Sequence, residues 1–228
     1  MAKTIEDIYA EYKIMPNLQE HMLRVAAVAF LICDNFNESL PMDDIVTACL
    51  LHDMGNIIKS NLLYFPEFVE PEGLSYWEDV KNKFIRKYGN NEHEATIKIM
   101  KELGLPDQIV ALVDQIFFSL LCSHRDSNNM SIKIIHYSDG RVDPNGIVSY
   151  DERMEEAKRR YKKNNVSIGA VGEEQRKELV ACGKEIEKQI FAKCKIAPED
   201  ITNETAASII SKLKDFVIHS IKTQDHGE

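Results

Sequence analysis

In the segment Thr47–Asn56, TACLLHDMGN, a run of small and apolar residues leads into an adjacent histidine and aspartate. Upstream of it, Pro41 suits the start of a helix, because its φ is already helical and its missing N–H leaves no donor unsatisfied. From Pro41 the spacing predicts a helix to about Met54, which Gly55 ends. Apolar residues fall on nearly every side of this helix, so we expect it to be central and buried.

The rest of the chain also has helical periodicity. Glycine (10) and proline (7) are few, and apolar residues recur mostly at three- and four-residue steps. Pro16 or Asn17 opens a strong helix whose apolar stripe includes His21. A capping box of Ser75 and Glu78 predicts another helix start. The later helices are expected at about 75–89, 91–103, 106–124, 130–142, 149–163, 172–194 and 203–221. The sequence therefore predicts an all-α fold, a helical bundle with additional C-terminal helices.

The composition is that of a globular protein with one core. The chain has 228 residues, of which 44% are hydrophobic and 29% charged. The longest apolar run, Val25–Cys33, is far shorter than the ~20 residues of a membrane span, and the first residues lack a signal-peptide pattern. We therefore expect a cytoplasmic protein with no membrane partner. The net charge of −9 argues against duplex nucleic acid as a partner, because that binding needs Lys and Arg on phosphates.

Five cysteines are present, and none forms a CxxC pair. An odd number leaves at least one cysteine without an intramolecular partner. We expect most of them to be reduced thiols in the core.

Several polar residues lie on apolar helix stripes, where an unpartnered polar group is costly. They are His21, the pair His52–Asp53, His93, His124 and Asp139. The expected helix 106–124 aligns His124 with Phe117, Leu120 and Leu121. Any single histidine of this kind is more often a hydrogen-bonded core residue, and that interpretation is preferred for His136. Taken together, imidazoles and carboxylates that face inward from successive helices favour a shared metal, because they are the usual ligands of Zn, Mn and Fe.

The order of these residues resembles the HD superfamily of metal-dependent phosphohydrolases. His21 in EHMLRVAAVA, His52–Asp53 in LLHDMGN and Asp139 in HYSDGRV follow its H…HD…D signature, and the resemblance covers about residues 17–143. It implies that these four residues bind one divalent metal, which activates a bound water for attack on phosphorus. Mn, Fe, Co, Ni and Zn all suit such ligands, so the sequence does not name the metal.

Two more histidines resemble residues of particular HD subfamilies. His93 in NNEHEAT is similar to a further histidine that serves as a second-metal ligand or as an acid on the substrate side. His124 is the other candidate for a second site, an order similar to that of bacterial diadenosine tetraphosphate hydrolases. The alternative for His124 is a helix-end residue, because SHRDSNN reads as a helix that gives way to a polar turn. We expect one metal per chain, with two as the alternative.

The sequence departs from the family pattern after the His–Asp pair. Many members continue as HDIGK or HDxxE, whereas HDMGN has Asn56 at the Lys position, with Lys59 three residues later. The carboxylate that positions the attacking water in HDxxE members is therefore missing. Glu92 is a candidate replacement, but its neighbour His93 would point about 100° away on a regular helix.

Charge that builds on the phosphate oxygens needs cations near the metal. Arg24, one turn after His21, and Lys59 are the best-placed candidates. Arg141 is less favoured, because it lies two positions after Asp139 and a helix would turn it elsewhere. For each cation the alternative is a structural salt bridge or a surface residue.

The segment 57–77 follows the His–Asp pair and is rich in aromatic residues. Such a long loop is usually functional or mobile. Its rings are Tyr64, Phe65, Phe68, Tyr76 and Trp77. Two interpretations are equally favoured: the rings stack on a base or cover the site as a lid, or they form a hydrophobic plug or a dimer contact.

We expect an HD domain at 1–165 and a C-terminal helical extension at 166–228, which completes the domain or mediates self-association into a homo-oligomer. The function expected from the resemblance is hydrolysis of a phosphate ester or anhydride of a small molecule, with a nucleotide favoured. A dinuclear iron oxygenase on the same scaffold is one alternative, and it needs His93 and His124. A regulatory module that binds a nucleotide without turnover is the other, and the missing HDxxE carboxylate favours it.

Overall fold

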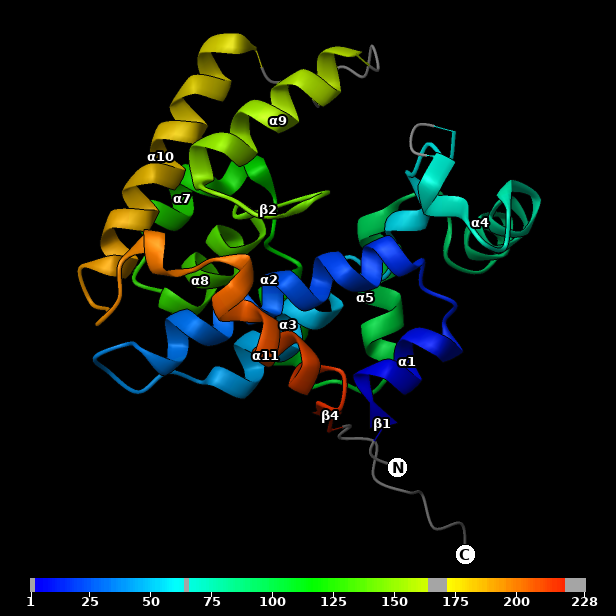
Figure 1. The fold of residues 1–228 in the computed structure, drawn as a ribbon, viewed down its shortest axis with the longest axis horizontal. Coiled ribbons are helices and arrows are strands. Elements are labelled where there is room, and N and C mark those ends of the chain that lie inside the picture. Colours follow the sequence, from blue (N-terminus) through cyan, green and yellow to red (C-terminus); the bar gives the residue numbers. More distant parts are fainter. Residues whose placement is uncertain (1–2, 64–65, 164–171, 220–228) are drawn as a thin grey trace, which may run out of the picture.

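A computed structural model describes residues 3–63, 66–163 and 172–219. Figure 1 shows an almost entirely helical molecule, which confirms the all-α prediction. The helices are α1 (Ile5–Glu11), α2 (Pro16–Asp34), α3 (Met42–Leu51), α4 (Leu74–Tyr88), α5 (Glu92–Glu102), α6 (Asp107–Val113), α7 (Leu121–Asp126), α8 (Met130–Asp139), α9 (Tyr150–Lys163), α10 (Glu173–Phe191) and α11 (Asn203–Leu213). Short 3-10 helices are η1 (Asn56–Ile58), η2 (Pro66–Val69), η3 (Phe118–Leu120) and η4 (Pro198–Asp200).

Helices α2 and α3 form the centre of the molecule, with α8 packed against both (Figure 1). Every residue of α3 from Ile45 to Leu51 is buried, as its all-round apolar pattern predicts. Three alanines of α2, Ala26, Ala27 and Ala29, are fully buried, and small side chains allow close helix packing. Burial of a Leu or Ile side chain contributes about 1.5–3 kcal/mol, so α3 is a main stabilising element.

The strands are short additions to this helical core. Strand β1 (Lys3–Thr4) pairs antiparallel with β4 (Val217–Ile218), with Lys3 opposite Ile218. Strands β2 (Val142–Asp143) and β3 (Gly146–Ile147) form a second antiparallel pair directly after α8. The first pair ties the two ends of the described chain together, as the lower part of Figure 1 shows.

The C-terminal helices lie on the same core as the motif-bearing helices. Helix α11 packs on α2, and α10 packs on α7 and α8. In Figure 1, α9 and α10 rise at the upper left, whereas α4 lies on the opposite side of the molecule.

Several predicted helix ends differ from those observed. Helix α3 ends at Leu51 rather than near Met54, because the chain turns there: the Met54 N–H donates to the Leu51 carbonyl (3.3 Å) and the Asn56 N–H to the Asp53 carbonyl (3.0 Å). His52 and Asp53 therefore lie in the turn after α3. The capping box predicted at Ser75 does not form, because α4 begins one residue earlier, after Gly73 with a φ of 86°. Helices α8 and α11 are also shorter than predicted.

The helix predicted over 106–124 is wrong as one element. It consists of α6, η3 and α7, with an irregular segment at 114–117. Phe117 adopts an extended backbone (φ −126°, ψ 132°), which breaks the helix. His124 is therefore not on one helical stripe with Phe117. The residues of this break contact His93 and His124 instead.

Most of the cysteines are free thiols, as predicted, and two of the five form a pair. Cys33, Cys49 and Cys194 are free, but Cys122 of α7 and Cys182 of α10 form a disulfide across 60 residues of sequence. Spacing alone did not indicate the pair, because it forms only when α10 packs against α7.

Among the described helices, none is long and apolar enough to cross a membrane.

Candidate metal centre

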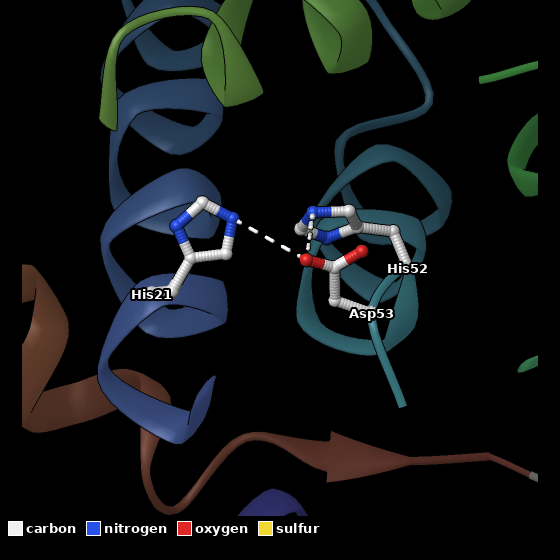
Figure 2. Close-up of side chains that lie close together, drawn as sticks. All are labelled: His21, His52 and Asp53. Carbon is white, nitrogen blue, oxygen red and sulfur yellow. Dashed lines mark ion pairs between the residues drawn. The ribbon is translucent and has the colours of Figure 1, made fainter. Parts of the chain in front are cut away.

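Three packed elements bring four predicted residues together. His21 lies in the second turn of α2, His52 and Asp53 in the turn after α3, and Asp139 at the last position of α8. Figure 2 shows His21 pointing from its helix toward the adjacent His52 and Asp53. These four residues, called the first cluster below, meet because α2, α3 and α8 pack against one another.

Three residues of the first cluster have the dimensions of a metal-binding group. One ligand atom each from His21, His52 and Asp53 lies within 4.8 Å of the others. Oδ2 of Asp53 is 3.6 Å from Nε2 of His21 and 3.7 Å from Nε2 of His52 (Figure 2). Oδ1 of Asp139 is 3.1 Å from Nε2 of His21 and 3.6 Å from Nε2 of His52. The metal-sized group thus contains two imidazoles and one carboxylate, and the Asp139 carboxylate lies outside that group but contacts both imidazoles.

The ring of His52 is fixed in the orientation that a ligand needs. Its Nδ1 donates to the carbonyl of Cys49 at 2.8 Å, and this type of support commonly fixes the tautomer of a metal-ligating histidine. Its Nε2 is buried and has no hydrogen-bond partner in the described part of the chain. In a neutral ring with a protonated Nδ1, this Nε2 carries a lone pair beside two carboxylates. That arrangement is favourable only with a cation between them, so the residues present fit a divalent metal.

The electrostatics of the first cluster point the same way. Burial alone would lower the pKa of His52, but the carboxylates of Asp53 and Asp139 outweigh it and raise the pKa to about 9. Burial alone would raise the pKa of Asp139, but the imidazoles of His21 and His52 hold it well below its usual range. Without a metal, a proton on His52 supplies the positive charge that the two carboxylates require.

His93 is engaged by a different part of the chain. It lies in the first turn of α5, where the side chain of Asn91 caps the helix by accepting from the Glu94 N–H (2.9 Å). Nε2 of His93 is 3.2 Å from Oδ1 of Asp114, and its ring packs on Phe117 with centroids 4.3 Å apart. Sequence reasoning missed both partners, because a continuous helix was expected where they lie.

His124 is held by the same connecting segment. Its Nε2 donates to the carbonyl of Gln115 at 3.0 Å, and its ring lies 5.4 Å from that of His136. Burial lowers the pKa of His136 to about 4, so this ring is neutral at physiological pH, and its Nδ1 is buried without a described hydrogen-bond partner. Within the described ranges, the metal-sized group of ligand atoms contains neither His93 nor His124. A second metal site at these two histidines stays a prediction.

Arg24 and Lys59, the two favoured cations, already have acidic partners. Nη2 of Arg24 is 3.0 Å from Glu20, and Nζ of Lys59 is 3.4 Å from Glu92. Arg141 has a structural role: it is 3% exposed and donates to the hydroxyl of Tyr137 and to the carbonyls of three residues, Val148, Pro198 and Ile201.

The aromatic segment after the His–Asp pair packs mostly inward. Trp77 is buried, Phe68 is half-buried against the core, and Tyr76 meets Trp77 edge-on with centroids 5.0 Å apart. Trp77 and Phe68 are therefore packing residues. An open hollow of about 680 Å³ lies between residues 59–63 and α4. Tyr64 and Phe65 lie outside the described residues, so the lid interpretation is untested for them.

Comparison with protein-family models gives one finding. Residues 18–162 match the model described as HD domain, a span that contains the whole first cluster as well as His93 and His124. Searches of curated proteins and of solved structures gave no match.

Proposed function

We propose that this chain, which belongs to the HD-domain family of metal-dependent phosphohydrolases, hydrolyses a phosphate ester or anhydride of a small molecule. The substrate that we favour is a nucleotide. The observation that carries the proposal is the first cluster, in which the buried Nε2 of His52 makes no hydrogen bond within the described residues and lies beside two carboxylates, 3.7 Å from Asp53 and 3.6 Å from Asp139. We expect one divalent transition metal per chain, held by His21, His52, Asp53 and Asp139.

A divalent metal at this position would polarise a phosphoryl oxygen and lower the pKa of water. The protein residues set the geometry for that chemistry. The Cys49 carbonyl fixes the tautomer of His52, and the two carboxylates supply the negative charge that retains a divalent cation. The side chains of His21, Asp53 and Asp139 are 20–31% exposed, so a substrate can approach from solvent.

Arg24 and Lys59 are our candidates for binding the phosphate. Both form exposed or half-exposed ion pairs with glutamates, and such pairs contribute only about 0–1 kcal/mol. A phosphate group carries more charge than one carboxylate and can therefore replace Glu20 and Glu92 as their partner. We keep His93 as a candidate acid on the substrate side.

A nucleotide is favoured over a simple phosphate ester because of Phe117. Phe117 is 42% exposed and its ring packs on His93, and an exposed aromatic residue offers a surface on which a base can stack. The net charge of −9 supports a small substrate rather than a nucleic-acid duplex. Self-association through the C-terminal helices stays a prediction.

A second candidate is a regulatory module that binds a nucleotide through the metal without turnover. Two observations favour this function. The HDxxE carboxylate is missing, and Glu92, the candidate replacement for it, forms an ion pair with Lys59. A nucleotide that raises the melting temperature while no product forms over hours would support this function, because ligand binding alone stabilises by mass action.

Metal analysis of the purified protein tests the main proposal. We expect about one transition metal per chain, its loss in Asp53→Ala, and Mn²⁺-dependent hydrolysis of at least one compound from a panel of nucleotides and sugar phosphates. No metal in either protein, even after incubation with Mn²⁺, Fe²⁺ or Zn²⁺, would refute it.

A further inference from the structure

The turn that carries the His–Asp pair is attached to α5 by one buried hydroxyl group. The Gly55 N–H donates to Oγ1 of Thr96 at 2.9 Å, and the Thr96 hydroxyl donates to the carbonyl of Glu92 at 3.0 Å. Thr96 is 1% exposed, so water does not compete for these bonds. The hydroxyl therefore bridges a backbone amide two residues after Asp53 to a backbone carbonyl one residue before His93.

The His–Asp turn and α5 lie so close together at Gly55 that no side chain fits between them. A Cβ atom on Gly55 would lie 2.2 Å from the carbonyl oxygen of Glu92 and 2.9 Å from both the amide nitrogen of Thr96 and Cβ of Ala95. Two of these are backbone atoms, which cannot rotate away as the end of a side chain can. Gly55 has a φ of −91°, so space rather than conformation requires glycine here.

Helix formation explains only half of this arrangement. A threonine inside a helix commonly donates to the carbonyl four residues earlier, as Thr96 does to Glu92. Helix geometry gives no such reason for the Thr96 hydroxyl to accept from the N–H of Gly55, which is 41 positions away. The second bond is specific to the contact between the His–Asp turn and α5.

The bridge lies where it can set the geometry of the site. On the motif side, the turn is short and hydrogen-bonded, since the Asn56 N–H donates to the Asp53 carbonyl, and a shift of Gly55 therefore moves Asp53. On the helix side, Thr96 is three residues after His93 and thus on the same helix face. The Glu92 side chain, one residue before His93, also meets Lys59 across the same contact.

We propose that Thr96 is a positioning residue that sets the distance between the metal-binding His52–Asp53 turn and the first turn of α5, where His93 and Glu92 project. This inference rests on the proposed function. Thr96 has no contact with substrate or metal in this role; it acts through the backbone of Gly55 and Glu92. Outer partners of metal ligands affect metal affinity and activity without touching either one.

The test compares three variants of the full chain. Thr96→Val removes the oxygen and keeps the shape, Thr96→Ser keeps the hydroxyl, and Thr47→Val makes the same substitution at a buried threonine of α3 outside the bridge. Mn²⁺ affinity is measured by titration. The values of kcat and KM are measured with the nucleotide that the wild type hydrolyses best, and Tm is measured without metal.

We expect Thr96→Val to weaken Mn²⁺ binding roughly tenfold and to lower kcat with little change in KM, at the lower end of the range for outer partners of metal ligands. Thr96→Ser should restore both values to within about twofold, and Thr47→Val should leave both unchanged even if its Tm falls. If Thr96→Val does not fold, Thr96→Ala replaces it, because it removes the same oxygen without adding a methyl group.

A Thr96→Val protein with a lower Tm but unchanged Mn²⁺ affinity and kcat would overturn the inference and leave the proposed function intact. A wild type that binds Mn²⁺ but hydrolyses nothing would refute the proposed function, while the Mn²⁺ titration would still decide the inference. A wild type that binds none of Mn²⁺, Fe²⁺ and Zn²⁺ would refute both.

Discussion

The first cluster and the two outer histidines, His93 and His124, use the same chemical groups but differ in how many carboxylates their ring nitrogens meet. In the first cluster, Nε2 of His21 and of His52 face the carboxylates of Asp53 and Asp139, and the Nε2 of His52 has no described hydrogen-bond partner. Nε2 of His93 meets Asp114, and Nε2 of His124 donates to the Gln115 carbonyl.

The groups around each ring nitrogen distinguish a metal ligand from a packed histidine. The segment 114–117 satisfies both outer imidazoles with ordinary protein groups, so they need no metal to be stable. The first cluster brings together two carboxylates with too little positive charge, so it needs a proton or a cation. A position in a sequence motif does not show this difference, whereas the partners of each nitrogen do.

The same substitution in both regions tests this distinction most directly. Asp53→Asn should remove the metal and lower hydrolysis at least ~100-fold, because a catalytic metal supplies several kcal/mol of transition-state stabilisation. Asp114→Asn, at the carboxylate that meets His93, should keep about one metal per chain. The measurement is elemental analysis with nucleotide hydrolysis, and equal metal loss in both variants would contradict the distinction.

Sequence reasoning succeeded where local pattern and packing agree. The apolar residues of α3 and of α2 point to two central helices, and these helices carry His21 and lead into His52–Asp53. Three helices that each bury an apolar face must pack together, so the convergence of their polar residues followed from the pattern. The ends of the helices were less predictable, since the turn after Leu51 depends on backbone hydrogen bonds rather than on composition.

The outer region could not be predicted in the same way. Residues 106–124 have helical spacing, but Phe117 is extended and the segment turns so that Asp114 and Gln115 reach the outer histidines. The Cys122–Cys182 disulfide and the Gly55–Thr96 contact also join distant residues. Such contacts depend on how the packed helices face one another, which a single sequence does not encode locally.

The pH dependence offers a second test of the first cluster. Because the pKa of His52 is raised to about 9, a metal must displace a proton from it below that pH. We expect Mn²⁺ affinity to rise with pH by up to about tenfold per unit and to level off near pH 9. Titrations at several pH values check this, and a pH-independent affinity between pH 7 and 9 would contradict it.

The metal-free protein should show the opposite trend in stability. The folded-state pKa of His52 lies above the ordinary value of 6.5, so its stabilising contribution is complete below about pH 6.5 and is lost as the pH rises toward 9. Melting temperatures in the presence of a chelator should therefore fall over this range. His52→Gln, which does not titrate, should lack that part of the decline.

Reduction of the disulfide should affect stability but not the first cluster. Cys122 and Cys182 close a loop across 60 residues, and a native disulfide of this kind contributes about 2–4 kcal/mol. It joins α7, which carries His124, to α10. We expect Cys122→Ser with Cys182→Ser to lower Tm by several degrees while the metal content stays at about one per chain. Loss of metal in this variant would show that the two regions are coupled.

The smallest expected change in metal content concerns His124 itself. His124→Ala removes the donor to the Gln115 carbonyl and the ring that packs on His136, so stability should fall by about 1–3 kcal/mol, the cost of leaving a buried polar group unpaired. Because its Nε2 is satisfied without a metal, the metal content should stay at one per chain, and elemental analysis of the folded variant measures this. A fall from two metals to one would instead assign His124 to a second site. It would also show that the segment 114–117 releases His124 on metal binding. The two-iron alternatives would then be the next to test.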